Sequence, residues 1–175
     1  MLVPGQIVTL LTFPGVIVHE TAHKLVCNML GIRVLKVCYF RFGNPAGYVA
    51  HEKPNNAIQQ IFIGIGPFLF NSIIGAIIAF PGALAYYSSK ASIVHYVLIW
   101  LGLSIAMHSF PSTGDANSIW RAMWMKGTPL LVRLVALPVI LIIYLGAIGS
   151  FFWLDLIYGV AVAFFLPRYL LALWK

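Results

Sequence analysis

Charged residues are scarce in this chain. Only 9% of its 175 residues are charged, whereas 61% are hydrophobic. A soluble domain carries about 25% charged residues, so the composition excludes an ordinary soluble domain and indicates an integral membrane protein. The length accommodates four or five spanning helices of about 20 residues each. No long polar linker or internal repeat divides the sequence, which predicts a single membrane-embedded domain over residues 1–175.

Cysteine is also rare, and a cleavable leader is not expected. Cys27 and Cys38 are too few to form a disulfide framework. The N-terminus has neither a basic region nor a small-residue cleavage site, so we expect no removable signal peptide. The net charge of +7 suggests nucleic-acid binding at first sight. However, the basic residues lie between apolar runs, where membrane topology explains them, and we expect no nucleic-acid partner.

The apolar runs predict an all-α polytopic membrane protein with about five transmembrane helices. The first three cover about residues 5–32, 57–86 and 92–110. The last apolar stretch, 129–174, is long enough for two spans, which we divide near residues 149–153.

Basic residues gather in alternate connections between these runs. They are Arg33, Lys36, Arg41 and Lys53 after the first run, Arg121, Lys126 and Arg133 before or just inside the fourth, and Arg168 and Lys175 at the end of the chain. The other connections contain only Lys90. The positive-inside rule then predicts that the N-terminus lies outside and the C-terminus in the cytoplasm.

The first connection has the pattern of a β-hairpin. VLKVCYFRF, residues 34–42, is rich in β-branched and aromatic residues, GNPAG is a turn sequence, and GYVAH follows at 47–51. Alternation around a turn predicts a small hairpin on the cytoplasmic side, between the first two helices. The alternative is a solvated loop that happens to contain valines.

The most informative motif is HETAH, residues 19–23. His19 and His23 are four residues apart and therefore share one face of a helix, where both imidazoles can bind a single Zn²⁺ at about 2.0–2.1 Å. Glu20 cannot share that geometry, but it can take a proton from a metal-bound water, whose pKa zinc lowers to about 7. This is the chemistry of the His-Glu-x-x-His motif of zinc metalloproteases.

The surroundings strengthen this interpretation over a chance match. A charged side chain at the bilayer centre costs about 2.5–3.5 kcal/mol, so such residues usually mark a function or a buried partner. About a dozen apolar residues precede His19, covering roughly 18 Å of a hydrocarbon core near 30 Å thick. The predicted site therefore lies within the membrane, nearer its cytoplasmic side.

Catalytic zinc usually takes three protein ligands and one water, so a third ligand must come from elsewhere. The chain has four carboxylates, and with Glu20 as the base three remain. Asp155 is expected near the outer end of the last span, on the wrong side of the membrane. Glu52 lies on the hairpin and reaches the site only if that loop folds back. Asp115 follows the third span and is best placed, provided that the chain dips back into the membrane.

Asp115 has an alternative role, and two further residues are weaker candidates. The sequence ANSIWRAM after Asp115 resembles a short helix, and aspartate is a favoured N-cap. His108 lies close by in sequence. Cys27 shares the face of the two histidines, but it is two turns past His19, so we expect it to pack against apolar neighbours.

Four segments of the chain resemble the site-2 protease family of intramembrane zinc metalloproteases. HETAH matches the family's zinc helix, and GIGPFLFNSIIGAIIA, residues 64–79, resembles the Gly-Pro and Asn span beside it. MHSFPSTGDANSIW, residues 107–120, resembles the segment that supplies the third ligand. The hairpin ending in GYV resembles the family's membrane-associated β segment. The family usually has Leu-Asp-Gly around the aspartate, whereas this chain has Gly114-Asp115-Ala116.

The resemblance covers roughly residues 5–125 and implies a catalytic three-helix core there, with accessory helices at about 129–174. It implies one Zn²⁺ per chain held by His19, His23 and Asp115, with Glu20 as general base. It also implies that Asn71 lines the substrate cleft; the alternative for Asn71 is a hydrogen bond between helices of the bundle.

The expected activity is hydrolysis of peptide bonds in or near transmembrane segments of membrane-protein substrates within the bilayer. A helical substrate must unwind first, and the hairpin edge at Gly47, Tyr48 and Val49 could then bind it by strand addition. Two rivals stay open. One is a membrane metalloprotease of another class with Glu52 as third ligand. The other is a metal-binding scaffold or transporter without catalysis.

Overall fold

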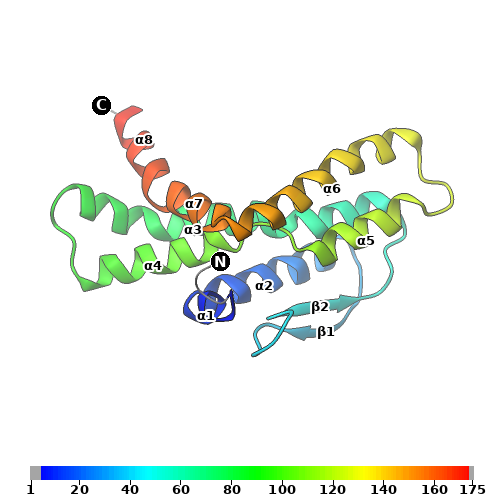
Figure 1. The fold of residues 1–175 in the computed structure, drawn as a ribbon, viewed down its shortest axis with the longest axis horizontal. Helices are drawn as coiled ribbons and strands as arrows, with labels where there is room; N and C mark the ends of the chain where they lie inside the picture. Colours follow the sequence, from blue (N-terminus) through cyan, green and yellow to red (C-terminus); the bar gives the residue numbers. More distant parts are fainter. Residues whose placement is uncertain (1–4, 174–175) are drawn as a thin grey trace.

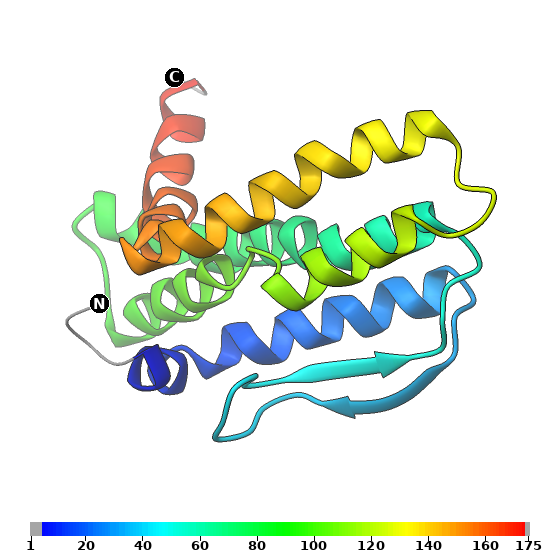
Figure 2. The ribbon, with the colours of Figure 1, turned by 45° about the vertical axis from the view of Figure 1, so that its right-hand side comes forward.

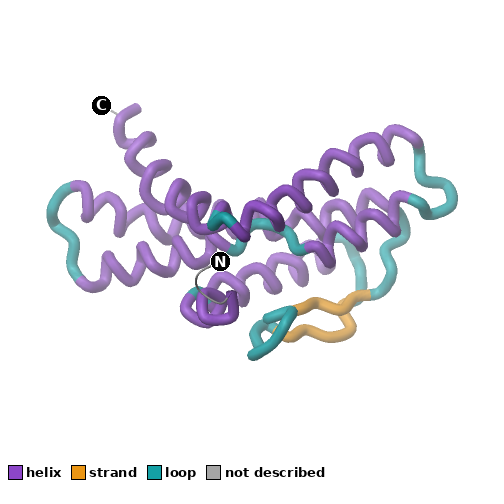
Figure 3. Tube along the Cα trace, viewed as in Figure 1, coloured by secondary structure: helices purple, strands orange, loops and turns teal. Residues whose placement is uncertain are grey.

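The computed structural model describes residues 5–173 and is mostly helical, with one antiparallel hairpin (Figures 1 and 3). In chain order the elements are α1 (Gly5–Leu11), α2 (Phe13–Met29), β1 (Val34–Cys38), β2 (Tyr48–His51), α3 (Ala57–Tyr87), α4 (Ile93–Met107), α5 (Thr113–Met123), α6 (Leu130–Phe151), α7 (Leu154–Val160), a π-helix (Ala161–Phe165) and α8 (Leu166–Leu173). The predicted helical class and the hairpin after the first helical segment are confirmed.

Three helical stretches are long and apolar enough to cross a membrane. They are α3, α6 and the continuous stretch Leu154–Leu173, which joins α7, the π-helix and α8. The predicted count of about five spans is not confirmed by helix length, because α2 has 17 residues and α4 has 15. The division of the last apolar stretch near residues 149–153 is confirmed, since α6 ends at Phe151 and α7 begins at Leu154.

The first predicted span is broken because Pro14 lies in the first turn of α2. Proline has no N–H to donate and its ring clashes with the carbonyl four residues earlier, so it fits the first turn of a helix but ends a helix that precedes it. Thr12 leaves the helical conformation, with φ −117° and ψ 25°. The chain therefore forms two helices, with α1 turned away from the direction of α2 (Figure 2).

The hairpin lies along α2 (Figure 3). Its two strands pair antiparallel, with Val34 opposite His51 and Cys38 opposite Tyr48, and an irregularity separates Val34 from Lys36. The sheet has only these two strands among residues 5–173. The outer edge of β2 therefore keeps backbone N–H and C=O groups that no third strand engages.

Helix α3 is the centre of the bundle, with α2, α4 and α5 running beside it (Figures 1 and 2). It approaches α4 closely at two glycines: a Cβ added to Gly75 would lie 2.8 Å from the carbonyl oxygen of Gly102. Small residues permit such close backbone approach between helices in a membrane.

Helix α5 is positioned by its apolar face. Its buried residues contact buried residues of α3 and α6, and the resulting cluster contains Ile61, Ala116, Ile119, Met123, Ala136, Ile140 and Ile143. Gly64 of α3 makes room for this contact, because a Cβ there would lie 2.7 Å from Cδ1 of Ile119 and 3.7 Å from Cβ of Asp115. The packing thus brings the first turn of α5 against α3.

Replacement of Gly75 by leucine is expected to lower the free energy of unfolding by about 3 kcal/mol, since overpacking a close contact costs roughly this amount. Denaturant titration of the purified protein in detergent measures the loss. Ile77→Ala on the same helix is the control, because Ile77 is 66% exposed. Equal stability of Gly75→Leu and the wild type would contradict the close contact.

Candidate metal centre

Helix α2 carries the three residues of the His-Glu-x-x-His motif. The side chains of His19 and His23 converge because they lie four residues apart, and their Nε2 atoms are 3.2 Å from each other. His23 and Glu20 are buried, each with 7% of its surface exposed. The predicted shared face of His19 and His23 is therefore present, with His23 buried inside the bundle and His19 half-buried.

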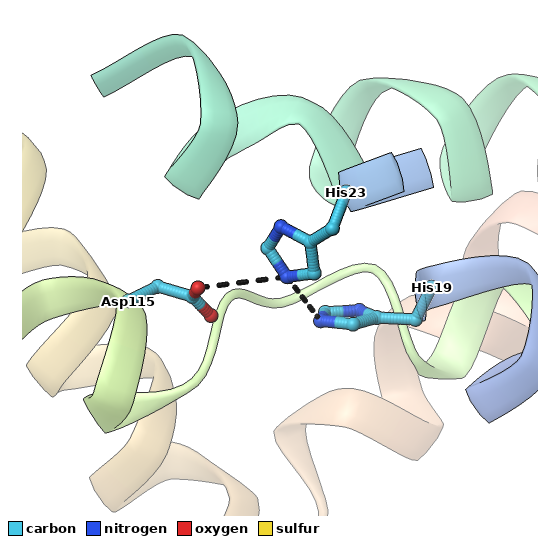
Figure 4. A group of neighbouring side chains, drawn as sticks. All are labelled: His19, His23 and Asp115. Atoms are coloured by element: carbon cyan, nitrogen blue, oxygen red, sulfur yellow. Dashed lines mark hydrogen bonds and ion pairs between the residues drawn. The ribbon is translucent and has the colours of Figure 1, made fainter. Parts of the chain in front are cut away.

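Asp115 completes the group (Figure 4). Its Oδ1 lies 3.5 Å from Nε2 of His23, and one candidate ligand atom from each of the three residues lies within 4.8 Å of the other two. These residues come from α2 and from the first turn of α5, which are far apart in the sequence. Among residues 5–173 this is the group of His, Cys, Asp and Glu side chains arranged to hold a metal ion.

Two backbone carbonyls fix the orientation of both imidazoles. Nδ1 of His19 lies 2.7 Å from the carbonyl oxygen of His108, and Nδ1 of His23 lies 2.9 Å from that of Ile63. A carbonyl oxygen only accepts hydrogen bonds, so each Nδ1 must carry the hydrogen. In the neutral rings both Nε2 atoms then present lone pairs toward the same point, as metal-binding histidines do.

Asp115 serves as both a helix cap and a candidate ligand. Ser112 is the N-cap of α5, and Asp115 occupies the N3 position, so the two residues form a capping box. Its Oδ2 accepts hydrogen bonds from the Ser112 backbone N–H at 2.7 Å and from the Ser112 hydroxyl at 2.6 Å. Oδ1 is left to face His23. The alternative role of Asp115 as the N-cap is not found, because Ser112 is the N-cap and α5 begins at Thr113. The capping contact that Asp115 does make is compatible with a ligand role, because each uses a different oxygen.

The donor set fits a divalent metal ion. Ligand bonds of about 2.0–2.1 Å in a tetrahedron place neighbouring donor atoms about 3.3 Å apart, close to the separations of 3.2 and 3.5 Å found here. Two imidazoles and one carboxylate with an open position suit catalytic zinc. The same set also suits non-haem Fe²⁺, so the group could hold a metal ion but does not select zinc.

Glu20 lies beside this group, under the hairpin. A Cβ added to Gly47 would lie 2.6 Å from Cγ of Glu20 and 2.8 Å from its Oε1. Only glycine lets the hairpin backbone come this close. No hydrogen bond from the described residues holds the carboxylate of Glu20, which leaves both of its oxygens free to accept a proton or a hydrogen bond.

The group opens into a cavity of about 640 Å³. His19, Glu20, His23 and Asp115 line it, and so do Gly47, Tyr48 and Val49 of the hairpin. The hairpin residues predicted to contact substrate are therefore beside the metal group.

Asn71 lies elsewhere than predicted. It is fully buried and does not line the cavity. Its Nδ2 lies 3.3 Å from the carbonyl oxygen of Gly15, 3.2 Å from that of Ile105 and 3.1 Å from that of His108. The position corresponds to the alternative, a hydrogen bond between helices. The His108 carbonyl also accepts a hydrogen bond from Nδ1 of His19. Asn71 therefore helps to hold the carbonyl that orients the His19 ring.

The other candidate residues, Glu52, Cys27 and Asp155, lie in three different environments. Glu52 is exposed, does not line the cavity and pairs with Arg33 at 3.6 Å. Cys27 is fully buried in an apolar cluster with Val26, Ile32 and Ile63, as predicted. The expected remoteness of Asp155 is wrong: the α6–α7 corner brings it to the wall of the same cavity.

No protein-family model, curated protein or solved structure matches the chain.

The sequence does not predict some of the groups that orient the candidate ligands. The carbonyls of Ile63 and His108 carry no side-chain pattern, so no motif marks them. Ser112 could have been found, since Ser-x-x-Asp before a helix resembles a capping box.

Ser112→Ala is expected to weaken metal binding by about 10- to 100-fold, the usual cost of losing an outer-shell partner. The loss arises because Oδ2 of Asp115 is no longer held and Oδ1 is free to turn away. Competition with a zinc chelator measures the affinity. Thr113→Ala, in the same turn, is the control and should bind metal like the wild type. Wild-type affinity in Ser112→Ala would refute the role of Ser112 in holding Asp115.

Proposed function

We propose that this protein is an intramembrane zinc metalloprotease of the site-2 protease type, which hydrolyses peptide bonds in or near transmembrane segments of membrane-protein substrates. One observation carries the proposal: the His19, His23 and Asp115 side chains converge beside a buried glutamate, within a bundle that contains three apolar helices of membrane-spanning length.

The proposed membrane arrangement has five spans, with α2 and α4 as the two short ones. At 1.5 Å per residue, the 17 residues of α2 cover about 25 Å, somewhat less than the hydrocarbon core. The basic residues in alternate connections support a cytoplasmic hairpin, an external N-terminus and a cytoplasmic C-terminus. The break at Thr12 removes the predicted depth nearer the cytoplasmic side, because residues 7–18 do not form one helix. His19 and His23 lie near the middle of α2, so the proposed metal group lies near the middle of this span.

The chemistry assigns a distinct task to each residue. His19, His23 and Asp115 would hold a Zn²⁺ ion, which would supply an acidified water and polarise the scissile carbonyl. His19 and His23 hold their Nε2 atoms toward the ion through their Nδ1 hydrogen bonds. A carboxylate oxygen of Glu20 accepts the proton of the attacking water and returns it to the nitrogen of the leaving amine. Asp115 contributes Oδ1 while its Oδ2 remains on Ser112.

The hairpin provides a surface for the substrate backbone. A peptide bond inside a transmembrane helix is shielded by the helical hydrogen bonds, so the substrate must unwind before cleavage. The free edge of β2 beside Gly47 and Tyr48 offers hydrogen-bond partners to the extended segment. The cavity also gives water a polar route to the site, which the hydrocarbon core would otherwise exclude.

Removal of the third ligand tests the metal site. Asp115→Ala is expected to lower zinc affinity by more than about 100-fold, since loss of an outer-shell partner alone costs 10- to 100-fold. Metal content after purification, measured by mass spectrometry, gives the result. Glu52→Ala is the matched control and should retain zinc. If Glu52→Ala loses metal and Asp115→Ala keeps it, the ligand assignment is wrong and the rival metalloprotease class is favoured.

Removal of the general base separates a protease from a metal-binding scaffold. Glu20→Gln keeps the shape of the side chain but cannot take a proton, so cleavage of a single-span substrate should fall by about 10²- to 10⁴-fold while zinc content is unchanged. The readouts are a gel assay in detergent and metal analysis, with Glu52→Gln as the control. Cleavage by Glu20→Gln at the wild-type rate would contradict the proposed role.

A further inference from the structure

The cavity has an unusual charge composition for this chain. The protein has 11 Lys and Arg residues but only four Asp and Glu. Three of those four carboxylates, Glu20, Asp115 and Asp155, line one cavity, and none of the residues that line it is Lys or Arg. Most of the acidic side chains of this basic protein therefore lie around a single cavity.

The proposed function accounts for two of these carboxylates. Asp115 is a ligand and Glu20 is the base, so together they balance the two positive charges of a divalent ion. Asp155 has no role in that chemistry and is the one negative charge in the cavity left without a counterpart.

Asp155 forms no ion pair with another residue in the described range 5–173, although His108 interacts with it electrostatically. It lies in the first turn of α7 and is partly buried, and its Oδ1 accepts a hydrogen bond from the Leu156 N–H at 2.9 Å. His108 also lines the cavity, but it forms no ion pair with Asp155, and its Nδ1 lies 2.9 Å from the Ser104 carbonyl oxygen.

An unpaired carboxylate in an apolar span costs free energy. Such residues usually face a cavity and mark the path of a substrate or an ion. The small polar side chains of Thr9 and Ser150 line the same cavity and leave space around it. A cation or a strong hydrogen-bond donor that enters the cavity with a substrate would supply the partner that Asp155 lacks.

We propose that Asp155 is a specificity-determining residue that binds a lysine or arginine side chain of the substrate segment. The proposal rests on the proposed function, because the cation is carried by the same segment that β2 places beside the metal. The substrate class is thereby narrowed to transmembrane segments that have a basic residue near the scissile bond. The basic side chain balances Asp155 when the peptide occupies the cavity, and a neutral or acidic residue in its place leaves the partly buried carboxylate unpaired.

The test uses a fluorescent single-span peptide of about 25 residues, with an apolar Leu/Ala core, a central Gly-Ser pair and one lysine moved through successive positions. Each peptide is compared with its norleucine and glutamate counterparts. Binding is measured with the zinc-loaded Glu20→Gln protein in nanodiscs, so that it does not depend on cleavage. At one lysine position binding should be about 10- to 100-fold tighter than with norleucine, as expected for a hydrogen bond between charged groups.

The variants of Asp155 decide the outcome. Asp155→Asn should remove the lysine preference, Asp155→Glu should restore part of it, and Asp155→Lys should favour the glutamate peptide instead. Zinc content and helical circular dichroism verify that each variant is folded and loaded. Glu52→Gln, the carboxylate away from the cavity, should keep the wild-type preference.

Three results would overturn the inference. The first is a wild-type protein that binds lysine, norleucine and glutamate peptides equally. The second is a lysine preference that survives in Asp155→Asn. The third is a loss of zinc in that variant, which would make Asp155 part of the metal site. Cleavage of the same peptides by the wild-type protein tests the proposed function separately: a charge preference in binding without any cleavage would refute the protease and leave the role of Asp155 intact.

Discussion

The site depends on a pair of hydrogen bonds from histidine Nδ1 to backbone carbonyls. By donating to His108 and Ile63, the rings of His19 and His23 are committed to one orientation, in which two Nε2 atoms face each other at 3.2 Å. Two lone pairs in that position repel each other in the absence of a cation. The proposed metal ion would convert this repulsion into coordination, and the nearby carboxylate of Asp115 would add to the attraction. Such an ion would stabilise the polar cluster inside the apolar bundle.

The rest of the bundle holds the partners of those hydrogen bonds in place. The Ile63 carbonyl belongs to α3, and Asn71 of the same helix holds the His108 carbonyl at the end of α4. Gly64 lets α5 approach α3 closely enough to deliver Asp115. Gly47 similarly lets the hairpin lie over Glu20. Small residues thus set the distances between the packed elements, while backbone carbonyls set the orientation of the imidazole rings. Substitutions remote from the ligands would act on the metal through these contacts.

The local parts of the site were predictable, and the long-range parts were not. The spacing of His19 and His23 determines their common face on any helix, and the alternation around GNPAG predicts the hairpin. Asp115 can cap α5 and serve as a candidate ligand only if Ser112 binds one of its two carboxylate oxygens. The conformation of the folded turn determines which oxygen that is. Asn71 was expected in a cleft, but its burial follows from how three helices pack. The position of Asp155 near the outer end of the last predicted span suggests a residue remote from the site, whereas the α6–α7 corner brings it to the cavity wall.

The central claim is that a metal ion occupies the point where His19, His23 and Asp115 converge. X-ray absorption spectroscopy at the zinc edge of the purified protein tests it most directly. The account predicts a zinc centre with nitrogen and oxygen ligands at about 2.0–2.1 Å, an imidazole scattering pattern from two histidines and no sulfur. A sulfur ligand at about 2.3 Å, which would involve Cys27 or Cys38, would contradict the account. So would a protein that binds no divalent metal when loaded under the same conditions.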